Sequence, residues 1–259
     1  MTEACPEIIT RQDGHLLEIR IERPERKNAL KQAMYSALTE ALNAGEADPN
    51  VRVMLITGTQ DCFTAGNDME DFLNSPGTDE DTPVMRFLNL LPVLTKPLMA
   101  AVNGPAVGVG TTLLLHCDLV YLGADARLQL PFVNLGLCPE AGSSLLLPQI
   151  VGYQRAAELL LLGEPFGAEK ARELGLANEV FASADYQQYA RDKAHQLAQQ
   201  PAAAVRLTKS LLKQHQREQL QQQLAEEGKA FGERLRSPEA REAIQAFMEK
   251  RQPDFTQFS

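Results

Sequence analysis

Alternating apolar and polar residues predict a β-hairpin at the start of the chain. The segments 7–12 and 15–21 flank the turn pair Asp13-Gly14, and Leu17, Ile19 and Ile21 alternate with polar residues. Two later runs, 51–58 and 98–102, are almost entirely apolar, as is typical of strands buried on both faces. The first hundred residues therefore supply several strands.

Between these strands the apolar residues recur at helical spacing. Leu30, Met34, Leu38 and Leu42 are spaced four apart, which indicates an amphipathic helix, and Asn28 is its expected N-cap. Further helices are expected near Met69, over 84–94 and after a glycine-rich turn at 103–110.

The strand pattern becomes sparse after Gly152. Helices are expected over 152–163 and 168–175, a last strand over 176–181, and three or four helices over 182–251. We therefore predict an α/β fold with a core at 1–182 and a helical region at 183–259.

Composition narrows the possible functions. The net charge of −9 argues against nucleic-acid binding, and no apolar run approaches the length of a membrane span. The four cysteines include no C-x-x-C pair, and the four histidines have no metal-ligand spacing, so we predict neither a metal site nor a disulfide framework. Together with the lack of a recognisable targeting segment, this predicts a cytoplasmic protein.

Two loops share an architecture that suits anion or oxyanion binding. In 64–68 ("TAGND") and 106–110 ("AVGVG"), small residues lead from a strand to a helix, and Asp68 is placed to cap the helix that follows it. Tight packing is the simpler interpretation of either loop, but free N–H groups at a helix start also bind a developing oxyanion. Neither loop matches a phosphate-binding or dinucleotide fingerprint.

A glutamate in the stretch Gly136 to Pro148 ("GLCPEAGSSLLLP") is the other candidate. Glu140 follows Pro139, where a helix is predicted to begin. Taken alone, this pattern favours an ordinary first-turn acid that the helix dipole stabilises.

Four ordered segments resemble the crotonase (enoyl-CoA hydratase/isomerase) superfamily. They are "ERPERKNAL", "CFTAGNDMEDF", "AAVNGPAVGVGTTLLLHCDLVYLGADARLQLPF" and "LLLLGEPFGAEKARELGLANEVF". The resemblance runs from about Ile9 to Phe181 and more weakly through the tail. It implies a spiral of ββα units with a helical C-terminal trimerisation region, a homotrimer or dimer of trimers, and an acyl-CoA thioester substrate. CoA belongs to the substrate, so no separate cofactor is implied.

The resemblance also implies roles for individual residues. The backbone N–H groups of Asn67 and Val109 would form the oxyanion hole beside Gly66 and Gly108. Hydratases of the superfamily use two glutamates, but Thr112 and Phe132 stand at those positions here. "PFVNLGLCPEAGSSLLLP" is similar to the peroxisomal-type Δ3,Δ2-enoyl-CoA isomerases, whose catalytic glutamate maps onto Glu140.

For the CoA moiety, the resemblance implies that Lys27 and Ala29 line the binding path, with Ala65 and Asp68 near the adenine. Arg23 and Arg26 are almost equally well explained by a solvated loop. The sequence thus predicts a 3-enoyl-CoA isomerase with Glu140 as proton shuttle. An isomerase of ring-derived acyl-CoA, a weak hydratase and a non-catalytic acyl-CoA-binding module stay open as alternatives.

Overall fold

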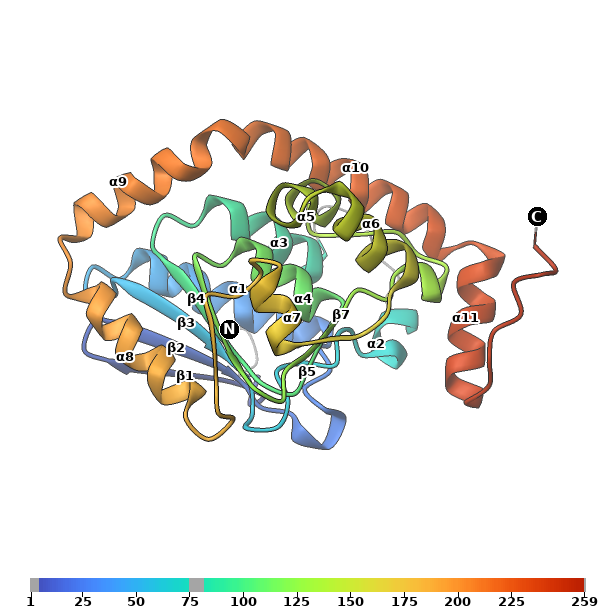
Figure 1. Cartoon of the computed structure of the whole chain (residues 1–259), viewed down its shortest axis with the longest axis horizontal. Coiled ribbons are helices and arrows are strands. Elements are labelled where there is room, and N and C mark those ends of the chain that lie inside the picture. The colour runs from blue at the N-terminus through green and yellow to red at the C-terminus, as the bar shows by residue number, and fades with distance from the viewer. Residues whose placement is uncertain (1–4, 75–81, 259) are drawn as a thin grey trace.

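Two β-sheets form the centre of the fold in the computed structural model, which describes residues 5–74 and 82–258 (Figure 1). The larger sheet has the order β1-β2-β3-β4-β6-β9, in which β1 is antiparallel to β2 and all other neighbours are parallel. Its strands are β1 (Ile8–Asp13), β2 (Leu16–Ile21), β3 (Val53–Thr57), β4 (Leu98–Val102), β6 (Leu119–Gly123) and β9 (Glu179–Phe181). The predicted hairpin, the two buried strands and the α/β class are confirmed.

A smaller sheet lies beside it and consists of β5 (Pro105–Val107), β7 (Arg127–Gln129) and β8 (Phe166–Gly167). β5 occupies the middle of the segment for which the glycine pattern predicted only a turn. The prediction missed this strand because three residues are too few to show alternation, and pairing with β7 and with Thr64 defines it.

The larger sheet is covered on both faces. Ile19, Ile56 and Ala100 point to one face, where they pack with α1 (Gln32–Ala47) and α3 (Pro83–Leu90). The alternate residues of the same strands point to the other face and pack with α8 (Tyr186–Ala198). Burial on both faces explains why the sequences of β3 and β4 are continuously apolar.

The remaining helices are mostly short. They are α2 (Met69–Asn74), α4 (Val109–Thr112), α5 (Ser143–Val151), α6 (Tyr153–Leu162) and α7 (Ala168–Glu173), with single 3₁₀ turns η1 (Pro24–Arg26), η2 (Leu91–Val93), η3 (Leu113–His116), η4 (Val133–Leu135) and η5 (Gln214–Gln216). Two of these helices, α4 and α7, pack on the smaller sheet. The predicted helix after the glycine-rich turn is thus α4 continued by η3.

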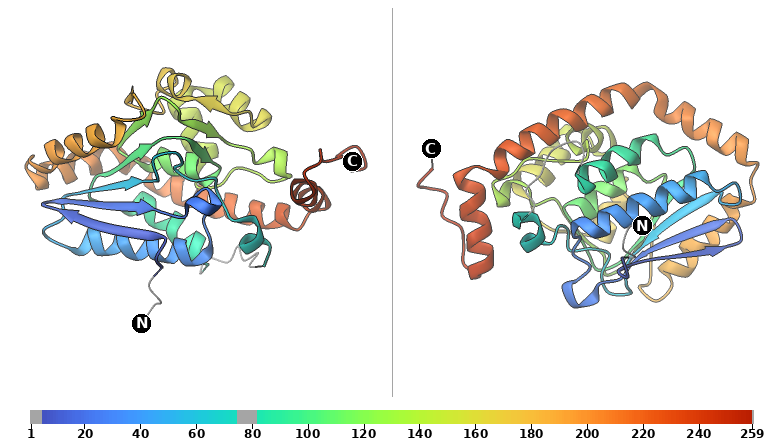
Figure 2. Two further views of the ribbon diagram at one scale, coloured as in Figure 1. Left: turned by 90° about the horizontal axis from the view of Figure 1, so that it is seen from below. Right: turned by 180° about the vertical axis from the view of Figure 1, so that it is seen from behind.

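Three helices complete the C-terminal region, and two of them arch over the core (Figure 2). These two are α9 (Ala202–Lys213) and α10 (Arg217–Leu235). α10 runs across α3 and α5, and α11 (Pro238–Glu249) extends away from the sheets. Lys209 and Lys213 anchor α9 through ion pairs of 2.8 and 3.2 Å with Asp118. No helix among residues 5–74 and 82–258 is long and apolar enough to span a membrane.

Two local predictions about helix starts are wrong. Asn28 does not cap α1, which begins at Gln32; it is fully buried in a left-handed conformation, and its amide donates to the carbonyl oxygens of Cys62 and Phe63. Glu140 is not a first-turn acid, because α5 begins only at Ser143. In both places the side chain bonds a distant segment, which sequence spacing does not record.

Candidate functional site

The backbone of Asn67 is held between two segments of chain. The N–H of Leu30 donates to Gly66 O at 2.8 Å, and the N–H of Asp68 donates to Leu30 O at 2.9 Å. Because successive peptide groups of an extended chain point in opposite directions, the N–H of Asn67 points away from Leu30. Gly66 has a φ of 90°, and a Cβ there would lie 2.9 Å from Val107 O, so the glycine lets the two loops come close.

Val109 stands at the start of α4, directly after Gly108 with its φ of 56°. Gly108 O accepts from the N–H groups of Thr111 and Thr112, so the first N–H of the helix, that of Val109, has no intrahelical acceptor. Within the described residues, neither the Val109 N–H nor the Asn67 N–H has a recorded hydrogen-bond partner. Two free donors are thus held on neighbouring loops.

Glu140 is hydrogen-bonded to α4, the helix that begins with Val109. The hydroxyl of Thr112, one helical turn after Val109, donates to Glu140 Oε1 at 2.5 Å. The buried Tyr35 hydroxyl donates to Asn67 Oδ1 at 2.5 Å, and burial, with a smaller contribution from the negative charge of Glu140, raises the pKa of Tyr35. The hydrogen bond from Thr112 therefore places Glu140 beside the helix that begins with Val109, and Tyr35 holds the side chain of Asn67.

The surroundings of Glu140 favour its protonated form. The residue keeps a little exposed surface, but protein atoms enclose its carboxyl group, and this burial raises its pKa to about 8. The hydrogen bond from Thr112 opposes the shift, while the negative charge of Glu227 adds to it. A carboxyl group with a pKa near 8 both accepts and returns a proton at physiological pH.

Phe132 and Thr112 occupy the two positions at which the sequence lacked carboxylates. Phe132 is 5% exposed and Thr112 is fully buried, and neither side chain ionises at neutral pH. Among the described residues, no group of three or more His, Cys, Asp or Glu is arranged to hold a metal ion.

The sequence analysis missed Glu227, which lies on α10 and is only 6% exposed. Its carboxylate accepts hydrogen bonds from the N–H groups of Gly142 at 2.6 Å and Ser144 at 2.9 Å. A signal was present, because Glu227 falls at helical spacing within the buried stripe Leu220, Leu224 and Phe231. An acid on an apolar stripe indicates a buried partner.

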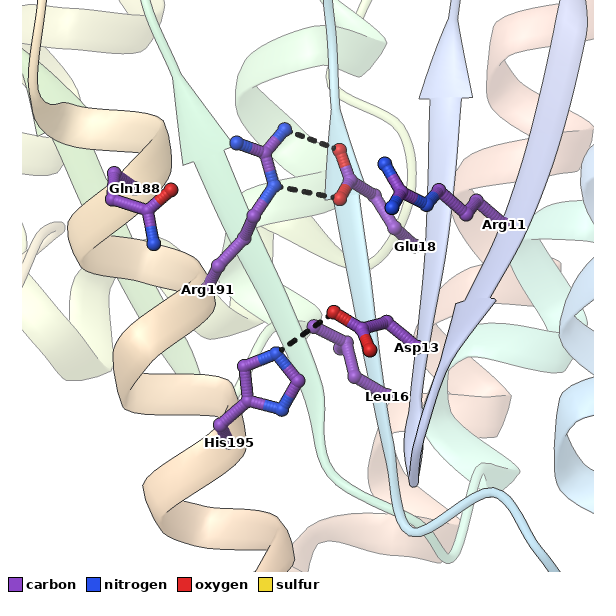
Figure 3. Close-up of a pocket in the computed structure, with 7 residues that line it drawn as sticks. All are labelled: Arg11, Asp13, Leu16, Glu18, Gln188, Arg191 and His195. Carbon is purple, nitrogen blue, oxygen red and sulfur yellow. Dashed lines mark hydrogen bonds and ion pairs between the residues drawn. The ribbon is translucent and has the colours of Figure 1, made fainter.

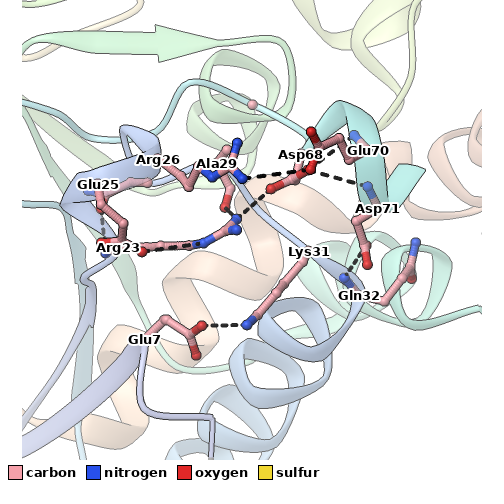
Figure 4. A network of polar contacts seen from close by, with 12 residues as sticks. Glu7, Arg23, Glu25, Arg26, Ala29, Lys31, Gln32, Asp68, Glu70 and Asp71 are labelled. Atoms are coloured by element: carbon pink, nitrogen blue, oxygen red, sulfur yellow. Dashed lines mark hydrogen bonds and ion pairs between the residues drawn. The ribbon is translucent and has the colours of Figure 1, made fainter. Parts of the chain in front are cut away.

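A network of polar contacts holds the segment that was predicted to bind CoA (Figure 4). Arg23 donates to Asp68 Oδ2 at 2.7 Å and to Ala29 O at 2.9 Å, and both charged side chains are nearly buried. Burial raises the pKa of Asp68, but the hydrogen bonds from Arg23 and from α2 outweigh it, so the pKa lies below its ordinary value. Asp68 also caps α2 as predicted, by accepting from the N–H groups of Glu70 and Asp71.

Lys27 and Arg26 are the exposed cations of this segment. Lys27 is in a left-handed conformation, and its carbonyl accepts the N–H of Ala65 at 2.9 Å. Among the described residues, the Arg26 side chain forms one ion pair, a long contact of 3.7 Å with the exposed Glu70. The Arg23 side chain is therefore engaged in hydrogen bonds within the protein, whereas the side chains of Lys27 and Arg26 are exposed to solvent.

A polar groove of about 280 Å³ lies elsewhere, between α8 and the hairpin (Figure 3). Arg191 forms two hydrogen bonds of 2.8 Å with Glu18, and His195 lies 3.4 Å from Asp13. None of the predicted site residues lines this groove. Its ion pairs fasten α8 to the sheet, and we assign it that structural role.

Comparison with known proteins places the chain in a family. The sequence model of the enoyl-CoA hydratase/isomerase family matches residues 11–258. The chain belongs to the enoyl-CoA hydratase/isomerase family. The crotonase-like fold expected from the sequence is thereby confirmed, since solved structures of this family share it.

Relatives in this family carry different activities in their names. The chain is 36% identical to 2,3-dehydroadipyl-CoA hydratase of Escherichia coli K12, over 96% of this chain and 98% of that protein. It is 33% identical to the mouse peroxisomal enoyl-CoA delta isomerase 3, over 93% of this chain and 77% of that protein. The structure of Pseudomonas aeruginosa OdaA superimposes with a TM-score of 0.92 and 51% identity, covering 94% and 99% of the two chains.

Family membership gives the observed geometry a chemical context, because the family is named for reactions of enoyl-CoA thioesters. The Thr112 hydrogen bond places Glu140 beside the helix that begins with Val109, and Gly66 packs the loop of Asn67 against strand β5, which leads to that helix. Since both hydratases and isomerases occur among the relatives, the choice between the two reactions depends on the side chains of this chain.

Proposed function

We propose that this protein isomerises 3-enoyl-CoA to 2-enoyl-CoA, with Glu140 as the only proton shuttle. The observation that carries the proposal is the buried Glu140 carboxyl group of raised pKa, hydrogen-bonded to Thr112 where a hydratase would have its first glutamate. Addition of water requires a second group to orient and deprotonate it, whereas moving a proton between two carbons requires one base.

The reaction begins when the thioester carbonyl oxygen of the substrate accepts hydrogen bonds from the N–H groups of Asn67 and Val109. Glu140 then removes a proton from C2, and the electron pair of that C–H bond enters a dienolate that extends to C4. The two N–H groups stabilise the negative oxygen, and each such donor is worth about 3 kcal/mol of barrier.

Return of the proton completes the shift of the double bond. Protonated Glu140 delivers the proton to C4, a C2–C3 double bond forms, and the thioester carbonyl is restored. The Thr112 hydroxyl donates a hydrogen bond to Glu140 Oε1, and this leaves Oε2 as the oxygen that carries the proton. Phe132, which replaces the second glutamate of the hydratases, is buried, and we propose that it keeps the site poor in water.

For CoA, we propose that Lys27 and Arg26 meet the phosphate groups, because they are the exposed cations of their segment. Ala29 and Ala65 contribute backbone surface along the path to the adenine. The Asp68 side chain positions this path through Arg23 rather than contacting the nucleotide, since its carboxylate is already occupied.

We also propose a homotrimer or a dimer of trimers, as the family resemblance implied. α9 supports self-association because Leu207, Leu211 and Leu212 are 61, 53 and 76% exposed on one short helix. A second copy of the chain is the partner that we assign to this surface, and sedimentation velocity measures the assembly. A cytoplasmic location is proposed because the four cysteines are free thiols.

Supplying 3-hexenoyl-CoA and 2-hexenoyl-CoA separately tests the function. Conversion of the 3-enoyl compound to the conjugated 2-enoyl compound, with slow or no hydration of the latter, is the expected result. Hydration of 2-hexenoyl-CoA at a rate comparable to isomerisation would overturn the proposal. A ring-derived acyl-CoA is the next substrate to supply if neither linear compound reacts.

A further inference from the structure

The loop that presents Glu140 adopts a costly backbone conformation. Ala141 and Gly142 both have positive φ values, of 59° and 70°, and Ala141 pays a steric penalty because it has a side chain. The carbonyl of Glu140 itself accepts from the N–H and the hydroxyl of Ser143. Contacts from other parts of the chain must keep this loop in place.

One contact comes from His116 at the end of η3. Its Nε2 lies 2.7 Å from Ala141 O, which makes Nε2 the protonated, donating nitrogen. Burial lowers the pKa of His116 to about 4, so the imidazole is neutral at physiological pH. His116 therefore holds the loop without adding a charge beside Glu140.

The second contact comes from Glu227 on the opposite side. Its Oε2 accepts the N–H of Gly142, and its Oε1 accepts both the N–H and the hydroxyl of Ser144. These donors belong to the left-handed turn and to the first turn of α5, where a negative charge is favourable. Burial raises the pKa of Glu227 above its ordinary value, and these hydrogen bonds, which favour the ionised form, limit the rise.

We propose that Glu227 is a positioning residue for Glu140: it fixes the loop that carries Glu140 and places a second negative charge beside it. This inference rests on the proposed function of Glu140 as the base. Of the two carboxyl groups, Glu227 stays ionised because three donors satisfy it, and Glu140 takes up the proton. The arrangement keeps Glu140 a stronger base than burial alone would make it.

Other titratable groups near Glu140 add little charge at neutral pH. Tyr35 on α1 and Cys138 in the same loop both have pKa values raised by burial, so both are neutral. Neutral Thr112 on α4 and neutral His116 on η3 complete the surroundings. Among the described residues around Glu140, Glu227 is thus the source of negative charge.

The test is a pH titration of Glu140 itself, which needs no substrate. The protein is labelled with [5-¹³C]glutamate, and the Glu140 signal is assigned by its loss in Glu140→Gln. The titration is repeated in Glu227→Gln, which removes the charge and one acceptor. The matched control is Glu226→Gln, which removes an equal charge from the neighbouring exposed residue of the same helix.

In Glu227→Gln the Glu140 midpoint should fall by roughly one pH unit, because a nearby like charge is gone. In Glu226→Gln it should stay in place. The pH profile of kcat should show the same displacement toward acid, accompanied by a lower plateau because the loop is less well held. A purely structural role for Glu227 would lower the plateau without moving the profile.

An unchanged Glu140 midpoint in folded Glu227→Gln would overturn the inference. If that variant does not fold, the titration is made on Glu227→Asp, whose shorter side chain moves the charge away by one carbon. The Glu140 midpoint should also fall in this variant. An unchanged Glu140 midpoint would again overturn the inference. Failure of the proposed function is recognised separately, because wild-type protein would then leave 3-hexenoyl-CoA unconverted whatever the titration shows.

Discussion

The two sides of the candidate site are built in different ways. The N–H groups of Asn67 and Val109 belong to the backbone, and each follows a glycine at the end of a short strand or bridge. Glu140 supplies a side chain from a loop outside regular structure, and His116 and Glu227 hold that loop from elements far away in the sequence.

Because of this difference, the backbone donors and the Glu140 side chain should tolerate different kinds of substitution. Backbone donors stay in place under most side-chain changes, because strand pairing and glycine conformation position them. The carboxylate depends on its own chemistry and on distant partners, so small isosteric changes should affect it strongly. Four predictions follow from this contrast, beginning with the largest effect.

Glu140→Gln should lower kcat by about 100- to 10,000-fold, because the amide keeps the size of the side chain but is not a base. Acyl-CoA should still bind, since the backbone donors and the CoA segment are untouched. Steady-state kinetics and calorimetric binding of an acyl-CoA measure the two quantities. A variant that turns over within a few-fold of wild type would return Glu140 to a structural role.

Val109→Pro should lower kcat by about 100- to 1,000-fold, because proline has no N–H to offer the oxyanion. Val109→Ala keeps the N–H and should change kcat by only a few-fold. Circular dichroism of both variants checks that the start of α4 is intact. Equal losses in two folded variants would contradict the role of the backbone donor.

Thr112→Val should shift the pH profile of kcat in the direction opposite to Glu227→Gln. The Thr112 hydrogen bond lowers the pKa of Glu140, so its removal should move the midpoint above about 8 and toward alkaline pH. At pH 7 the expected loss is roughly tenfold for a shift of one unit. A profile that moves toward acid would show that Thr112 does not donate to the ionised carboxylate.

The last prediction concerns the dependence of stability on pH. The folded pKa of Glu140, about 8, lies above its ordinary value of 4.5, so its contribution to stability is fully present below pH 4.5 and is lost as the pH rises toward 8. Glu140→Gln carries no ionisable group there, and its free energy of unfolding should exceed that of wild type increasingly from pH 5 to pH 8. Urea denaturation at pH 5, 7 and 9 measures the difference, and a constant difference across this range would contradict the raised pKa.

Sequence patterns predicted the parts of this protein whose partners are local or periodic. The hairpin, the doubly buried strands β3 and β4 and the cap that Asp68 forms on α2 all follow from spacing over a few residues. The two glycine-containing loops were recognisable for the same reason. Family resemblance then named Asn67, Val109 and Glu140 as candidate site residues, and their roles stay a prediction.

Only the tertiary structure decided what surrounds these residues. The sequence pattern placed Glu140 in a first helical turn and Asn28 at a helix cap. In the fold, Glu140 lies in the loop before α5, and Asn28 is buried against the loop that contains Cys62. Glu227 comes 87 residues after Glu140 in the chain, yet its charge lies close enough to raise the pKa of Glu140. Local spacing determines hydrogen bonds along the chain, whereas the pKa of a buried carboxyl group depends on every charge and donor that folding brings near it.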